Sequence, residues 1–271
     1  MPRTPSDMAT ESRLQRTAPS LLTLISIAAV AAAFVGMARE AVSHAVAVHL
    51  ASGGLASSAG VFSQVNSPTR LAGTCGTLAT LALGGLAALL VRADKRFTAG
   101  WYFLWVFGSV CLMNSGRLLY SAITGTGDWS VVIATFNPPW LWRVLIGAAG
   151  IVIYRPAVRF ATAGLRGLIQ NRELAYRDLW RLILSAYLTA SILLTAATVL
   201  HPVNSGLMVL AVAATSFGLN FGLLVVPAFI SEPVEFEPIA PRPMPFSWFW
   251  LIFALLAASA FLAGLGRAIS L

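Results

Sequence analysis

The chain has 271 residues, of which 58% are hydrophobic and only 10% charged, with a mean hydropathy of +0.79 and a net charge of +8. Few soluble folds tolerate this composition, which is typical of a protein solvated by lipid. The positive charge is divided among short segments between apolar stretches, so we do not expect a nucleic-acid partner.

Residues 1–19 are polar and contain prolines and serines, which predicts a flexible cytoplasmic tail. Beyond them, windows of about 20 apolar residues recur, and each is long enough to cross a bilayer core of roughly 30 Å. The sequence therefore predicts an all-α, polytopic membrane helix bundle with about seven transmembrane helices in a single domain over 20–271. The predicted spans are 20–38 (running on towards 50), 72–91, 101–120, 139–154, 180–200, 206–230 and 246–266.

The first span contains "AAVAAAF", whose small residues resemble a signal-peptide cleavage site. Its polar lead is long for a signal peptide and the helical pattern continues past it, so we favour an uncleaved anchor. The second span carries Gly73, Gly76, Ala79 and the pair Gly84–Gly85, which predicts a helix that packs closely at the centre of the bundle. Cys75 and Cys111 lie inside spans without ligand spacing, and we expect them to be core residues.

The basic residues between the spans predict the topology. If the chain starts in the cytoplasm and crosses seven times, most of them fall on the cytoplasmic side, while Arg70 and Arg267 fall outside. This asymmetry follows the positive-inside rule and predicts an N-in, C-out protein of a plasma membrane, of the bacterial inner-membrane type. The cytoplasmic set is Arg3, Arg13, Arg16, Arg92, Lys95, Arg96, Arg155, Arg159, Arg166, Arg172, Arg177, Arg181 and Arg242.

Two connections on the cytoplasmic side have distinct patterns. Residues 155–178 place basic side chains every four to seven positions among apolar ones, which predicts a helix lying on the membrane surface. Residues 231–245, "SEPVEFEPIAPRPMP", contain five prolines and three glutamates and are expected to be an extended spacer that could also bind a partner.

Polar groups inside the predicted spans are costly and therefore candidates for function. By the predicted topology they all lie towards the outer ends of their helices, where they could line one cavity. They are Arg39, Glu40, His44 and His49 near the end of the first span, Asn114 and Arg117 in the third, and Asp128 and Arg143 nearby.

Glu40 and His44 are four residues apart, so they lie on one helix face about 40° apart, whereas His49 lies about 140° from His44. A carboxylate and an imidazole at this spacing can supply two metal ligands. Asp128 is the carboxylate that could supply a third, and the three together would suit Zn²⁺, Fe²⁺ or Mn²⁺.

Two alternatives need no metal. Glu40 could form a structural ion pair with Arg39, Arg117 or Arg143, while Asp128 closes the turn in "TGTGD". The three arginines could also line an anion- or lipid-binding cavity. The residue chemistry leaves all three interpretations open.

Two segments together resemble the site-2-protease-like membrane zinc metalloproteases. They are "FVGMAREAVSHAVAVHLASGG", with its E-x-x-x-H pair and double glycine, and "LWVFGSVCLMNSGRLLYSAITGTGDW", with an asparagine followed by Gly-Asp. That family has a helix with H-E-x-x-H-A and a later span with an asparagine that leads to a zinc-binding aspartate. The resemblance covers about residues 20–155.

The resemblance implies roles for particular residues. His44 matches the second histidine of the motif, Asp128 the third zinc ligand and Asn114 the asparagine that positions substrate or backbone. Glu40 stands in place of the first histidine, and Ala41 stands in place of the glutamate that moves the proton in peptide hydrolysis. The site would also lie outside, whereas the family has it near the cytoplasmic face.

These features favour a divergent metalloprotease-like membrane protein without standard peptidase activity, in which Glu40, His44 and Asp128 form a candidate metal site for Zn or another divalent ion. No catalytic residue is assigned, and whether the chain is an enzyme is left open. The alternative is a non-catalytic subunit or scaffold of a membrane complex, in contact with lipid and other membrane proteins. A transporter is disfavoured, because the sequence has no inverted repeat.

Overall fold

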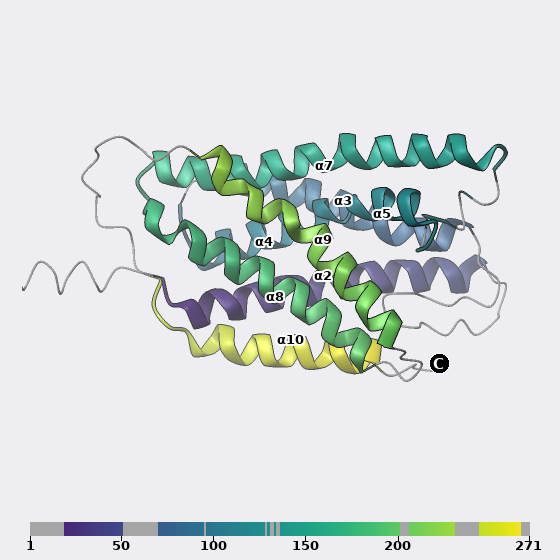
Figure 1. The fold of residues 1–271 in the computed structure, drawn as a ribbon. Helices are drawn as coiled ribbons and strands as arrows, with labels where there is room; N and C mark the ends of the chain where they lie inside the picture. Colours follow the sequence, from purple (N-terminus) through teal and green to yellow (C-terminus); the bar gives the residue numbers. More distant parts are fainter. Residues whose placement is uncertain are drawn as a thin grey trace, which may run out of the picture.

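The computed structural model describes residues 19–50, 70–94, 96–127, 129–130, 133, 136–200, 206–230 and 244–266, and for 44–50, 70–73, 198, 207–208 and 265–266 it describes only the helical backbone. Every regular element in these ranges is helical (Figure 1). The elements are α2 (Leu21–Leu50), α3 (Arg70–Ala93), α4 (Ala99–Met113), α5 (Gly116–Thr124), α7 (Pro139–Gln170), η1 (Tyr176–Asp178), α8 (Leu179–Val199), α9 (Gly206–Val225), η2 (Val226–Phe229) and α10 (Trp248–Gly266). The all-α prediction is confirmed for this part of the chain.

Five helices are long and apolar enough to cross a membrane, which supports a multi-pass membrane protein. Their apolar segments are Leu21–Ser43, Thr74–Ala93, Pro139–Gln170, Tyr176–Ala197 and Val209–Phe229, and α10 adds a shorter one over Trp248–Gly264. A helix suits this environment because all its backbone hydrogen bonds are made within the segment.

The third predicted span is divided into two helices. Helix α4 ends at Met113 and α5 begins at Gly116, with Asn114 and Ser115 between them. The break leaves α4 with 15 residues and α5 with 9, so neither alone has the length of a straight transmembrane helix. The apolar pattern predicted the segment, but it did not predict the break.

Helix α2 lies in the middle of the bundle and contacts α3, α4, α8 and α10 (Figure 1). Most of its residues from Leu24 to Val35 are buried, although Ile25 and Phe34 are exposed, and 61% of its apolar segment is buried, against 39% for α3. The expectation that the second span occupies the centre is therefore wrong. Its glycines do allow close packing, because a Cβ at Gly84 would lie 2.9 Å from the Cβ of the buried Cys111.

The prediction of a separate surface helix over 155–178 is also wrong. Helix α7 continues without interruption to Gln170, and its second half packs inside the bundle. The reason is an apolar stripe at helical spacing, which the arginines between its members obscured in the sequence. The buried members of this stripe are Ala157, Phe160, Ala161, Leu165 and Leu168, while Arg155, Arg159 and Arg166 are exposed.

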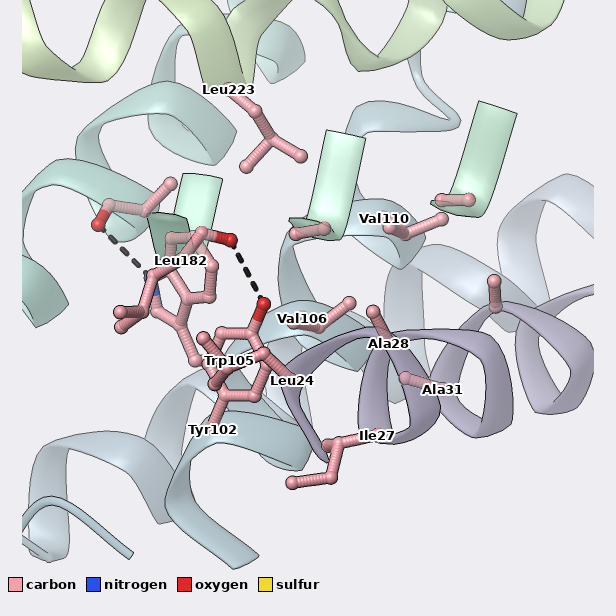
Figure 2. Close-up of a cluster of buried hydrophobic side chains, with 14 of the residues drawn as sticks. Leu24, Ile27, Ala28, Ala31, Tyr102, Trp105, Val106, Val110, Leu182 and Leu223 are labelled. Carbon is pink, nitrogen blue, oxygen red and sulfur yellow. Dashed lines mark hydrogen bonds between the residues drawn. The ribbon is translucent and has the colours of Figure 1, made fainter. Parts of the chain in front are cut away.

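Two aromatic residues of α4 join it to neighbouring helices through their polar atoms (Figure 2). The hydroxyl of Tyr102 donates a hydrogen bond to the carbonyl of Leu182 in α8, at 2.8 Å. The indole nitrogen of Trp105 donates to the carbonyl of Ala161 in α7, at 3.0 Å. Both side chains are fully buried, so these bonds satisfy groups that would otherwise be costly inside the bundle.

Another hydrogen bond of a tyrosine joins α7 to α9. The hydroxyl of Tyr154 donates to the carbonyl of Leu219 at 2.7 Å and accepts the backbone N–H of Gly222 at 2.9 Å. Further along, the guanidinium of Arg166 donates to the carbonyl of Phe229 in η2. Helix α7 is therefore hydrogen-bonded to α9 through Tyr154 and to η2 through Arg166.

Candidate functional site

Helix α2 carries two adjacent charged residues, Arg39 and Glu40, inside the bundle. Arg39 and Glu40 are 5% and 7% exposed, and Nη2 of Arg39 lies 3.4 Å from Oε1 of Glu40. The two charges are therefore paired within the bundle, as one of the alternatives from the sequence expected. Pairing lowers the cost of removing each charge from water.

Helix α3 approaches this ion pair through Gly76. A Cβ at Gly76 would lie 2.9 Å from the carbonyl oxygen of Arg39 and 3.0 Å from its Cγ, and it would overlap the hydroxyl oxygen of Ser43. Only a residue without a side chain allows the two backbones to come so close. The backbone of α3 thus lies directly against Arg39 and Ser43 of α2.

A second polar pair occupies the break between α4 and α5. Nε of Arg117 donates to Oδ1 of Asn114 at 3.1 Å, and Nδ2 of Asn114 donates to the carbonyl of Val110 at 3.1 Å. Both residues are 6% exposed. Asn114 therefore satisfies a backbone carbonyl at the end of α4 and orients the guanidinium that follows.

Arg143 has a different environment, because it is exposed near the start of α7. Its guanidinium lies beside Gly125, the left-handed residue (φ 69°) that ends α5, and a Cβ there would lie 2.8 Å from Nη2. A cation at the C-terminus of a helix interacts favourably with the helix dipole. The location favours a capping role for Arg143.

The predicted metal site is only partly described. Glu40 and His44 lie one turn apart on α2, as expected, but nothing is described of the His44 side chain. Asp128 lies outside the described residues. Among the side chains that are placed, no three His, Cys, Asp or Glu residues gather closely enough to hold a metal ion.

The sequence singled out Arg39, Glu40, Asn114 and Arg117 but did not predict how they would be arranged. It expected one shared cavity, which stays a prediction; the described contacts include an Arg39–Glu40 pair on α2 and an Asn114–Arg117 pair at the start of α5. The small residues of the second span, Gly76 among them, predicted its close packing, but they did not predict that Gly76 would contact Arg39 and Ser43.

Comparison of this chain with models of known protein families, with curated proteins and with solved structures found no match. The function must therefore be argued from geometry. In the described contacts, the buried charges of Arg39, Glu40 and Arg117 each interact with a residue one to three positions away along the chain. Such groups are suited to fixing the arrangement of helices.

We predict that the Arg39–Glu40 pair is energetically coupled. Changing either residue alone to Gln leaves a buried charge without its ion-pair partner, so Arg39→Gln and Glu40→Gln should each lower the free energy of unfolding by about 3–5 kcal/mol. The double variant should lose less than the sum, with a coupling of about 0.5–3 kcal/mol.

The measurement is reversible unfolding of the purified protein in mixed micelles. Arg155→Gln is the matched control, because that arginine is exposed on α7 and should change stability little. Strict additivity of the two single changes would contradict an ion pair between these side chains.

Proposed function

We propose that this chain is a non-catalytic subunit or scaffold of a membrane complex, in which the buried polar residues determine how the helices pack. The observation that carries this proposal is the Arg39–Glu40 pair. Glu40 is the residue on which a metal-binding interpretation of α2 depends. In the scaffold its carboxylate instead balances the charge of a neighbouring arginine.

The other described polar contacts support the same proposal. Tyr102, Trp105 and Tyr154 each bond to the backbone of another helix. In lipid, interhelical hydrogen bonds and close packing replace the hydrophobic effect as the source of association between helices. A protein built in this way presents a rigid surface to lipid and to other membrane proteins.

We also propose that the chain crosses a plasma membrane seven times, with α4 and α5 together forming one crossing and with its N-terminus in the cytoplasm. Successive long helices run in alternating directions (Figure 1). Exposed arginines flank the connections at one end of the bundle. Arg92 lies in the last turn of α3 and Arg96 between α3 and α4, while Arg177 precedes α8 and Arg181 lies in its first turn. This distribution agrees with the positive-inside rule.

Labelling of single cysteines tests the topology. In a background with Cys75→Ala and Cys111→Ala, we expect Arg96→Cys to resist a membrane-impermeant maleimide added to intact cells and to react after the membrane is opened. Thr126→Cys, which is exposed after α5, should react in intact cells. The reverse pattern would contradict the proposed orientation.

The second candidate function is the divergent metalloprotease-like protein suggested by the sequence resemblance, with a Zn or other divalent ion held by Glu40, His44 and Asp128. It is favoured by the continuity of α2 through Leu50, which keeps Glu40 and His44 one turn apart. Ala41 follows Glu40 directly, so this candidate would bind a metal without the usual proton-transfer residue.

Elemental analysis separates the two candidates. For a scaffold, we expect the protein purified in mild detergent to contain well below one Zn, Fe or Mn ion per chain. One ion per chain that is lost in Glu40→Ala, His44→Ala and Asp128→Ala would instead support the metalloprotease-like candidate. Glu173→Ala, a carboxylate beyond the other end of α7, is the matched control and should leave the metal content unchanged.

A further inference from the structure

A cavity of about 240 Å³ lies at the end of the bundle where α3 ends and α4 begins. It runs along the last three turns of α7, between Phe160 and Asn171, a distance of about 16 Å along the helix axis. None of the described polar residues of the candidate site lines it. It belongs to the opposite end of α3 from Gly76.

The cavity is apolar inside and polar at its mouth. Its floor includes Trp101, Phe160 and Leu168, which are 3%, 5% and 1% exposed. The mouth is formed by the exposed residues Arg92, Asp94, Gln170 and Asn171. A phospholipid in a bilayer has the same arrangement, with a polar headgroup at the membrane surface and apolar acyl chains further inside.

The depth of the cavity also suits a lipid. The apolar segment of α3 runs from Thr74 to Ala93, so Arg92 and Asp94 lie where this segment ends. Twenty helical residues cover a hydrocarbon core of about 30 Å. The mouth therefore lies at the height of the headgroups, where phospholipid is present at high concentration.

Small residues of α7 keep the cavity open. A Cβ at Gly164 would lie 3.0 Å from Cδ1 of Trp105, so packing alone accounts for that glycine. A Cβ at Gly167 would meet no atom within 4 Å, although Gly167 lines the cavity. Gly167 can therefore accept a larger side chain that fills the cavity without displacing its neighbours.

The mouth carries one cation and one anion. Oδ1 of Asp94 accepts the backbone N–H of Arg96 at 3.0 Å, which restrains the carboxylate at the mouth, two residues along the chain from Arg92. A phosphate suits the guanidinium of Arg92, and a primary ammonium group with its N–H donors suits the carboxylate of Asp94. We propose that this cavity binds one phospholipid with a zwitterionic aminoethyl headgroup, a phosphatidylethanolamine, with the start of an acyl chain on the apolar floor.

The size agrees with partial insertion of the lipid. Sites that enclose a whole small molecule usually have about 300–1,000 Å³. A volume of about 240 Å³ accommodates a headgroup and the first part of one acyl chain, while the remainder stays in the bilayer. The inference requires only that this end of the bundle meets a membrane surface, so it is independent of the metal content and of the scaffold proposal.

Native mass spectrometry of the delipidated full chain in detergent tests the site. Phosphatidylethanolamine, phosphatidylcholine and phosphatidylglycerol with identical acyl chains are added separately. We expect one phosphatidylethanolamine per chain, bound roughly tenfold more tightly than phosphatidylcholine, since trimethylation removes the ammonium donors. Asp94→Asn should abolish this preference while keeping the acceptor for the Arg96 N–H.

Gly167→Leu should lower phosphatidylethanolamine binding about tenfold, because the leucine occupies the cavity. Gly218→Leu is the matched control, since Gly218 is exposed on α9 and also has open space at its Cβ. Equal binding of the three lipids, tighter binding of phosphatidylglycerol, or equal effects of the two leucine variants would each overturn the proposal. If Gly167→Leu fails to fold, the exposed Asp94→Asn variant still decides the question.

Discussion

The close packing of α2 against four other helices is the constraint on which the rest of the structure depends. Its segment from Ala28 to Ala33 consists largely of alanine and is inaccessible. Lipid chains are as apolar as leucine, so helices gain little by burying large apolar side chains against each other. Small side chains allow the backbones to approach and maximise van der Waals contact, which places α2 at the centre.

The same close packing explains why charged residues are tolerated on α2. Beyond the alanine segment, Arg39 and Glu40 neutralise each other, and the backbone of α3 lies against Arg39 and Ser43 at Gly76. A buried ion pair is seldom a large net source of stability, but removing one member is expensive. The two residues are neighbours on α2, so the pair neutralises charge within one helix, and the scaffold proposal assigns it the role of allowing α2 to pack against α3 at this point.

Much of the architecture could be predicted from the sequence, because spans of apolar residues are a strong signal. Each of the seven predicted segments contains helix, and Cys111 is buried as expected, whereas Cys75 is only partly buried. The failures have physical reasons. Exposed arginines on α7 obscured its buried stripe. The turn-forming residues Asn114, Ser115 and Gly116, where α4 ends and α5 begins, were outweighed by the apolar residues on both sides. For the candidate site, the helix period placed Glu40 beside His44, but the choice of Arg39 as ion-pair partner required three-dimensional structure.

The close contact between α2 and α3 beside Arg39 can be tested by adding a single methyl group to α3. Gly76→Ala should lower the free energy of unfolding by about 1–3 kcal/mol, since its Cβ would lie 2.9 Å from the carbonyl oxygen of Arg39 and would overlap the hydroxyl of Ser43. Gly85→Ala is the matched control on the same helix, because a Cβ there meets no atom within 4 Å, and it should be neutral or stabilise by up to about 1 kcal/mol. Destabilisation by Gly76→Ala alone, measured by reversible unfolding in mixed micelles, is the predicted result. Equal effects of the two variants would contradict a bundle in which α3 packs this closely on α2.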